Sequence, residues 1–269
     1  MNGPTVFVIM PAYNSERFVE EAIRSVMAQT FLDWKLLVID DGSSDHTVEI
    51  VQRLCREDSR ITLLQNPQNM GVAYTRNRGL ELCDGQFAAL LDSDDVWHED
   101  KLEKQLHLAK STGADVIYCS YGIMDEQGKK HCEDFLVPEE TDFDRTLIQG
   151  YISCSTALLS EKIVKAYRFD SQYYHEDLAL WLQILQDGCK ACGVTEVLAQ
   201  YRVMEGTRAA NKLRSAMYRG QIYRKMLGYS LFKSGKLLVQ YGLLGLKKYK
   251  QTTSKDEING RKEPADPIT

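Results

Sequence analysis

Patterns typical of strands alternate with patterns typical of helices through the first ninety residues of this 269-residue chain. Short runs rich in Val, Ile and Leu between turn residues predict buried strands, and apolar residues at spacings of three and four predict helices. We expect strands at 6–10, 35–39, 61–65 and 87–91, and helices at 16–29, 47–56 and 71–83, the first of them capped by Ser15. Strands that alternate with helices form a mostly parallel sheet covered on both faces. The sequence therefore predicts an α/β fold.

The second half of the chain has a less regular pattern. We expect helices at 100–112 and 178–186, strands at 116–121 and 197–203, and a polar loop at 122–144 with a short strand near Phe135. Helical patterns return at 212–232 and 236–249, and the polar end of the chain is expected to be disordered. We divide the chain into a main domain at 1–211, with halves 1–97 and 98–211, a helical basic extension at 212–251 and a disordered tail at 252–269.

The net charge of −5 conceals a basic segment near the C-terminus. Twelve Lys and Arg side chains, and no Asp or Glu, lie between Gly206 and Lys255. This segregation predicts an anionic partner for the region. Nucleic acid is a poor candidate, because no recognised binding module accompanies the charge. Two alternatives stay open for 212–250: contact with an anionic membrane surface, or packing on the main domain or on a dimer partner.

Targeting and spanning segments are not expected in this chain. The apolar run at 5–10 is too short for a signal peptide, and no stretch of about 18 apolar residues follows. The seven scattered cysteines are typical of reduced thiols in a cytosol. Cys189 and Cys192 form a lone C-x-x-C pair, which we interpret as ordinary semi-buried cysteines rather than a metal or redox site. These features predict a cytoplasmic protein, with peripheral contact to the inner face of the cell membrane as an open possibility.

Acidic residues cluster where two of the predicted strands end. Asp40 and Asp41 follow one strand, and Asp92-Ser93-Asp94 follows another. Ligands of open α/β sheets bind outside the carboxyl ends of the strands, so we expect these turns to meet at one site. The D-x-D carboxylates can hold Mn²⁺ or Mg²⁺, or a ribose hydroxyl. Turns stabilised by Asp side chains are the simpler interpretation of each cluster taken alone.

A third acidic pair, Glu176-Asp177, precedes an apolar helical pattern. A carboxylate in this position can serve as a helix cap, which is the simpler interpretation of the pair taken alone. In a group-transfer enzyme the same carboxylate can act as a general base.

An ordered set of short motifs resembles the family 2 glycosyltransferases. The motifs are V-I-M-P-A-Y-N (8–14), Q-T-F-x-x-W (29–34), V-I-D-D-G-S-S-D-H-T (38–47), N-x-G-V-A-Y-T-R-N-x-G (69–79), L-D-S-D-D (91–95), H-E-D-L-A-L-W (175–181) and Q-Y-R-V (200–203). The resemblance covers most of the chain, from about 6 to about 212. It implies a Rossmann-like GT-A fold and an inverting, metal-dependent transfer of a sugar, with a UDP-sugar as donor and a hydroxyl of a glycan or lipid-linked glycan as acceptor, in cell-surface polysaccharide biosynthesis.

The resemblance also implies roles for the residues at matching positions. Pro11, Ala12 and Tyr13 would line the base pocket, Asp41 would accept a hydrogen bond from the base, and Arg76 would lie near the base or diphosphate. Asp92 would approach the ribose and the metal ion, Ser93 would contact the donor, and Asp94 would ligate Mn²⁺ or Mg²⁺. Asp177 would deprotonate the acceptor hydroxyl, with Glu176 nearby for acceptor or sugar contacts. Trp181 is expected to pack rather than to catalyse.

One position departs from the pattern of the family. Many relatives carry a His shortly after the Y-R pair, whereas this chain reads V-M-E-G-T-R from 203 to 208. Arg208 or Lys212 could neutralise the diphosphate from a mobile loop, and a solvated basic loop is the equal alternative. A nucleotidyltransferase is disfavoured because Pro11-Ala12-Tyr13-Asn14 stands where that class needs a Gly-rich basic loop. A non-catalytic nucleotide- or sugar-binding protein is disfavoured because the acidic motifs are intact.

Overall fold

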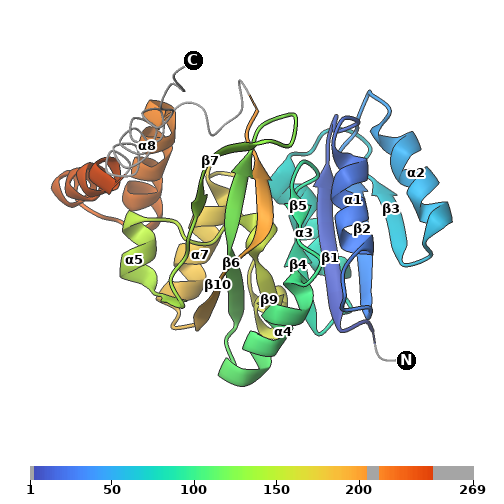
Figure 1. Cartoon of the computed structure of the whole chain (residues 1–269). Coiled ribbons are helices and arrows are strands. Elements are labelled where there is room, and N and C mark those ends of the chain that lie inside the picture. Colours follow the sequence, from blue (N-terminus) through green and yellow to red (C-terminus); the bar gives the residue numbers. More distant parts are fainter. Residues whose placement is uncertain (1–2, 205–211, 245–269) are drawn as a thin grey trace, which may run out of the picture.

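A computed structural model describes residues 3–204 and 212–244 of the chain, and its described strands form one sheet (Figure 1). The strand order is β3-β2-β1-β4-β9-β6-β10-β5, with β7 beside β6 and β8 beside β10. The strands are β1 (Val6–Ala12), β2 (Trp34–Asp40), β3 (Ile61–Gln65), β4 (Phe87–Leu90), β5 (Val96–Trp97), β6 (Val116–Met124), β7 (Lys130–Phe135), β8 (Glu140–Thr141), β9 (Leu158–Ser160) and β10 (Ala191–Arg202).

Strand direction sets where the site can form. Strands β3, β2, β1 and β4 are parallel, and β6 is parallel to β10. Because β9 lies antiparallel to both β4 and β6, these six strands share one direction. Strands β5, β7 and β8 are also antiparallel to their neighbours, so the sheet is mixed around a parallel majority. The carboxyl ends of the six strands therefore lie along one edge of the sheet. This is the edge at which the acidic turns were predicted from the sequence.

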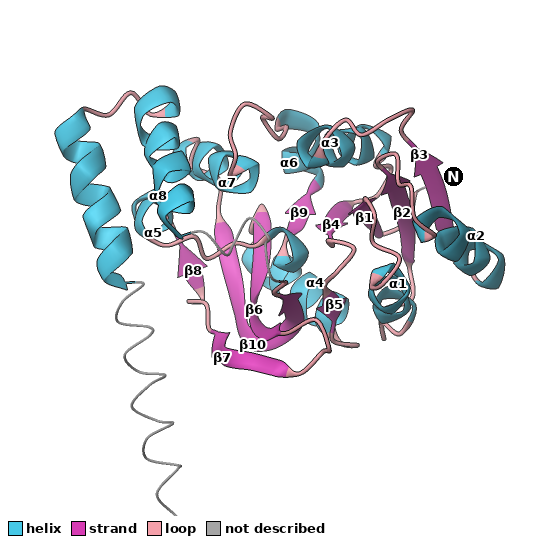
Figure 2. Cartoon of the chain, turned by 90° about the horizontal axis from the view of Figure 1, so that it is seen from above, coloured by secondary structure: helices cyan, strands magenta, loops and turns pink. Residues whose placement is uncertain are grey.

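Helices cover both faces of the sheet, as Figure 2 shows from above. They are α1 (Val19–Met27), α2 (Thr47–Glu57), α3 (Val72–Leu82), α4 (Lys101–Thr112), α5 (Phe143–Ile148), α6 (Glu161–Ala166), α7 (Glu176–Gln186) and α8 (Lys212–Gln221), with a short 3₁₀ turn at Cys154–Thr156. Alternate residues of β1 point to opposite faces. Val6 and Val8 belong to the core cluster that also contains residues of α1, α2 and α4, whereas Phe7 and Ile9 belong to the cluster that contains residues of α3, α6 and α7.

The last described residues form helices that pack on the main domain. After α8 come a π-helical turn at Ile222–Met226 and a further helix at 231–244. Ile222 and Tyr223 are fully buried in one cluster with Leu147, Leu178 and Leu182 of α5 and α7. No helix in the described ranges is long and apolar enough to cross a membrane. The predicted tail at 252–269 lies outside the described residues.

Several local expectations were wrong. The hydroxyl of Ser15 caps no helix: it is buried without a hydrogen-bond partner, and α1 begins at Val19 after a turn that uses the Ser15 carbonyl. The short strand expected near Phe135 is confirmed as β7, but the segment 122–144 also contains β8 and begins α5, which were not expected. Pairing with β6 and β10 stabilises these two polar strands. The helix expected at 212–232 is interrupted at Gly228, whose φ of 65° ends a helical run.

Lys101, the first residue of α4, has its side chain buried where this helix packs on the sheet. Its side chain is fully buried, its Nζ donates a hydrogen bond to Gln105 Oε1 at 2.8 Å, and the same atom lies 3.9 Å from the centre of the Trp97 ring. Burial lowers the pKa of Lys101 from 10.5 to about 8. The folded chain therefore holds this proton less tightly than the unfolded chain does.

We expect Lys101→Met to change how the stability of the protein depends on pH. Between about pH 8 and 10.5 the unfolded wild-type chain binds more protons at this site than the folded one. Relative to the variant, the wild type should therefore gain about 2 kcal/mol of unfolding free energy between pH 7 and about pH 9.5. Urea unfolding of both proteins at the two pH values measures the difference, in which the titration of other groups cancels. The same difference at both values would contradict a buried, charged Lys101.

Candidate active site

A cavity of about 970 Å³ opens at the carboxyl edge of the parallel strands. It is lined by the end of β1, the turn after β4, the first half of α3 and the start of α7. Ten of the eleven site residues expected from sequence line this cavity: Pro11, Ala12, Tyr13, Asp41, Arg76, Asp92, Ser93, Asp94, Glu176 and Asp177. The eleventh, Arg208, lies outside the described residues. Segments far apart in the sequence thus converge on one space.

The D-x-D turn after β4 brings two carboxylates together. Burial, followed by the negative charge of Asp92, raises the pKa of Asp94 from 3.8 to about 6. A divalent cation would offset both effects, and two carboxylates with phosphate oxygens are a set that Mg²⁺ and Mn²⁺ accept. Within 3–204 and 212–244 no three His, Cys, Asp or Glu side chains gather into a metal cage. The residues present therefore fit a cation shared with a phosphorylated ligand.

Arg76 joins this turn to α7. Its Nη2 donates to Asp92 Oδ1 at 2.6 Å and its Nη1 to Glu176 Oε1 at 2.9 Å, while the guanidinium lies 5.3 Å from the centre of the Phe169 ring. The side chain is buried. Burial alone would lower the pKa of Arg76, but the charge of Asp92 and that of Glu176 raise it well above its ordinary value. Arg76 lines the cavity as expected, and its contact with a base or diphosphate stays a prediction.

Asp41 organises the loop that leads into α3. Its carboxylate accepts hydrogen bonds from Asn66 Nδ2 at 2.7 Å, from the Met70 backbone N–H at 2.9 Å and from the Gly71 N–H at 2.8 Å. Gly71 has a φ of 89°, which favours glycine. A carboxylate offers about four lone-pair sites, so one is left after these three bonds, and Asp41 is among the residues that line the cavity. The expected bond from Asp41 to a nucleotide base stays a prediction.

Glu176 and Asp177 lie in the first turn of α7. The residue at the cap position is His175, so neither carboxylate is the cap that the simpler interpretation required. Glu176 is buried against Arg76, whereas Asp177 is only partly buried, and its Oδ1 accepts a bond from the Leu178 N–H at 2.7 Å. Asp177 therefore keeps an oxygen that can face a ligand. Trp181 is buried and packs edge-on against Phe169, in line with the packing role expected for it.

The D-x-D turn is held by residues that were not predicted from the sequence. The buried carboxylate of Asp95 accepts bonds from the Arg202 backbone N–H at 2.8 Å and from the Ser155 hydroxyl. The same Ser155 oxygen accepts the Asp92 N–H at 3.1 Å. Burial, then the charges of Asp94 and Asp92, raises the pKa of Asp95 well above its ordinary value. Asp95 stands in a quoted motif, whereas Ser155 lies in a region with no readable pattern.

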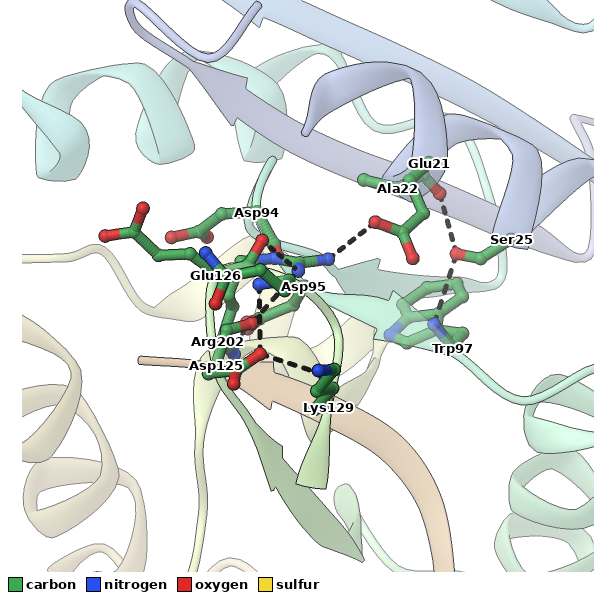
Figure 3. A network of polar contacts seen from close by, with 11 residues as sticks. Glu21, Ala22, Ser25, Asp94, Asp95, Trp97, Asp125, Glu126, Lys129 and Arg202 are labelled. Atoms are coloured by element: carbon green, nitrogen blue, oxygen red, sulfur yellow. Dashed lines mark hydrogen bonds and ion pairs between the residues drawn. The ribbon is translucent and has the colours of Figure 1, made fainter. Parts of the chain in front are cut away.

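Arg202 at the end of β10 extends this support to the first helix (Figure 3). Its Nε donates to the Asp94 carbonyl at 2.8 Å, and its Nη2 donates to Glu21 Oε2 of α1 at 2.6 Å. The Arg202 side chain is buried, whereas the side chain of Glu21 is 55% exposed. Arg202 therefore fixes the backbone of the D-x-D turn from the far half of the sheet.

The C-terminal helices also contribute to the cavity wall, which sequence analysis did not anticipate. Ser215, Arg219 and Tyr241 line it, and the Arg219 guanidinium lies 4.6 Å from the centre of the Tyr241 ring. Ser215 Oγ lies 3.0 Å from His175 Nε2, beside the start of α7. The described part of the extension thus forms one side of the same cavity.

Comparison with known sequences identifies the family. The sequence model described as Glycosyl transferase family 2 matches residues 7–167. The putative teichuronic acid biosynthesis glycosyltransferase TuaG of Bacillus subtilis is 32% identical over 91% of this chain and 97% of its own length. The enzyme WfgD of Escherichia coli, named UDP-Glc:alpha-D-GlcNAc-diphosphoundecaprenol beta-1,3-glucosyltransferase, is 32% identical over 97% of this chain and 100% of its own length.

Solved structures support the fold. Staphylococcus aureus TarS 1–349, in complex with UDP-GlcNAc, matches with a TM-score of 0.68 at 20% identity, over 88% of this chain and 71% of that one. The mannosyltransferase PcManGT of Pyrobaculum calidifontis, in complex with GDP-Man and Mn²⁺, matches with a TM-score of 0.67 at 17% identity, over 85% and 65%. The expected GT-A fold is confirmed. With the family model matching most of the chain and relatives aligned along nearly their whole length, the chain belongs to glycosyl transferase family 2.

Proposed function

We propose that this glycosyltransferase moves a sugar from a UDP-sugar to a hydroxyl group of a lipid-linked glycan, with inversion at the anomeric carbon and with a divalent cation. One observation carries the proposal: the D-x-D carboxylates and the Glu176-Asp177 pair line one cavity and are joined through Arg76. The two pairs suit the two tasks of sugar transfer, which are stabilising the departing diphosphate and activating the attacking hydroxyl.

The donor would lie across the carboxyl ends of β1 and β4. Pro11, Ala12 and Tyr13 would flank the uracil, with Asp41 as acceptor for a base N–H. Tyr13 is 49% exposed, so its ring is accessible for stacking. Asp92 and Asp94 would hold Mn²⁺ or Mg²⁺, which when bound neutralises charge on the diphosphate. Two solved structures of this fold support the donor and the ion, since one is described with UDP-GlcNAc and another with GDP-Man and Mn²⁺.

The acceptor hydroxyl would be activated by Asp177. Its carboxylate takes the hydroxyl proton while the oxygen forms a bond to the anomeric carbon, and the bond from that carbon to the diphosphate breaks, with the electron pair leaving on the diphosphate. A single displacement inverts the configuration and needs no carboxylate nucleophile. Glu176, held by Arg76, would contact the sugar or the acceptor. The beta linkage in the name of WfgD agrees with this course for an alpha-linked donor.

The names of relatives support the class of acceptor and the setting. WfgD and WfaP of Escherichia coli are both named for a diphosphoundecaprenol acceptor, and TuaG is named for teichuronic acid biosynthesis. We therefore place the proposed reaction in bacterial cell-surface polysaccharide biosynthesis, on the cytoplasmic side of the membrane. The proposed division of the main domain assigns the donor to residues 1–97 and the acceptor to 98–211.

We expect Asp177→Asn to slow transfer by about two to four orders of magnitude, because the amide cannot accept the hydroxyl proton. The affinity for UDP should stay within about twofold, because Asp177 has no role in donor binding. Steady-state transfer rates and calorimetric UDP titration give the two quantities. Asp144→Asn, an exposed carboxylate in the first turn of α5, serves as the matched control and should behave like the wild type. Loss of UDP binding in Asp177→Asn would rule out the role of general base.

We expect Asp94→Asn to weaken Mn²⁺-dependent UDP binding by about 10- to 100-fold, because the cation loses one of its two carboxylates. Calorimetric titration of UDP, GDP and CDP, each with Mn²⁺ and with EDTA, measures the dependence and the base preference. The wild type should prefer UDP and should lose affinity in EDTA. Equal UDP affinity of the wild type with and without Mn²⁺ would refute the metal site.

A further inference from the structure

The helix at 231–244 has one buried side and one exposed side. Ser234, Leu237, Leu238 and Tyr241 lie on the buried side, on which Tyr241 contacts Arg219 of α8 and both leucines pack against the cluster around Ile222 and Tyr223. The opposite side carries an apolar stripe, defined here as Phe232, Val239 and Leu243, whose side chains are 86%, 62% and 56% exposed. At 100° per residue, these three lie within one narrow sector of the helix. Large apolar side chains gathered on one helix side mark an interaction surface.

The surroundings of the apolar stripe are basic. Lys233 and Lys236 are exposed on the same helix, and Arg224 and Lys225 are exposed just before it. The segment 206–255 carries twelve basic and no acidic side chains. An apolar face bordered by Lys and Arg is the composition of helices that lie in a membrane interface and attract anionic lipid. A symmetric dimer through the apolar stripe would instead bring the lysines of two copies together, which is unfavourable.

The buried side of the same helix reaches the active-site cavity. Tyr241 lines the cavity and covers Arg219, and Leu237 and Leu238 pack on the cluster formed with α5 and α7. Figures 1 and 2 show this helix beside α8 at the edge of the molecule, far from β3 at the other edge. One helix therefore connects the exposed apolar stripe with a wall of the cavity.

We propose that the apolar stripe docks on an anionic lipid bilayer, with Lys233 and Lys236 contacting the headgroups, and that docking brings the Tyr241 wall of the cavity to the membrane. The lipid contact is inferred only from the apolar stripe and the basic residues around it. The role we assign to that contact, which is to bring a lipid-linked acceptor to the cavity, rests on the proposed function. A membrane-bound acceptor diffuses in two dimensions, so an enzyme held at the surface meets it at a raised effective concentration.

Vesicle flotation of the full chain tests the docking. Vesicles of phosphatidylglycerol and phosphatidylcholine are compared with vesicles of phosphatidylcholine alone, at low and high salt. We expect binding to the anionic vesicles only, weakened by salt. The double variant Phe232→Glu/Val239→Glu should lose at least about tenfold in partitioning. Lys233→Glu/Lys236→Glu, which leaves the apolar stripe intact, should lose about tenfold.

The matched control introduces two Glu substitutions at exposed leucines outside the helix at 231–244. Leu32 and Leu136 are 69% and 67% exposed and lie outside the cavity lining, so Leu32→Glu/Leu136→Glu should partition like the wild type. The thermal unfolding midpoint, measured on every variant, reports that each one folds. No binding of the wild type to anionic vesicles, equal binding to neutral vesicles, or an equal loss in the control would overturn the proposal.

Two further readouts separate the possible failures. Sedimentation of the wild type without lipid should show a monomer, and a dimer that Phe232→Glu/Val239→Glu dissociates would overturn the proposal in favour of a second copy on the apolar stripe. Vesicle binding and UDP binding are measured independently. Docking without any UDP binding would refute the proposed function and support the lipid surface. UDP binding without docking would support the proposed function and overturn the lipid surface.

Discussion

Arg76 is buried between two carboxylates that belong to different parts of the chain, Asp92 after β4 and Glu176 at the start of α7. Removing one member of such a buried group leaves an uncompensated charge and costs about 3–5 kcal/mol. The carboxylates of the cavity can stand this close because the guanidinium balances them. The relative position of the D-x-D turn and α7, and therefore of the proposed donor and acceptor sides, depends on this one side chain.

A second set of contacts holds the backbone of the D-x-D turn, and it comes from Ser155, β10 and α1. Asp95 is tied to Ser155 and to the end of β10, and Arg202 bonds the Asp94 carbonyl and reaches Glu21 of α1. The backbone of the turn is thus fixed by residues that do not enter the cavity, which leaves the side chains of Asp92 and Asp94 to face it. Arrangements that hold functional groups in place before the ligand arrives are what electrostatic catalysis requires.

The sequence predicted the elements whose signal is local. The strands of the first half and the acidic turns at their ends follow from short apolar runs and from the direction of parallel strands, and the ordered motifs identified the family. The bridge made by Arg76 could not be predicted in this way, because it joins residues 16 and 100 positions apart. A short strand was expected near Phe135, but its extension back to Lys130 through polar residues depends on pairing with β6, and Ser155 has no pattern around it. Tyr241 reaches the cavity only because the last helices fold back on α5 and α7, a tertiary contact that no local periodicity encodes.

The central claim is that the cavity is a single site, in which the donor and its cation lie beside the D-x-D turn and Asp177 lies on the acceptor side. A crystal structure of the complex with UDP and Mn²⁺, with anomalous diffraction measured at the manganese edge, tests this directly. We expect one strong anomalous peak within coordination distance of Asp94 and of a diphosphate oxygen, with Arg76 still bonded to Glu176 and with the Asp177 carboxylate open to the remaining space. Manganese or UDP bound elsewhere on the protein, or a diphosphate seated against Asp177, would contradict it.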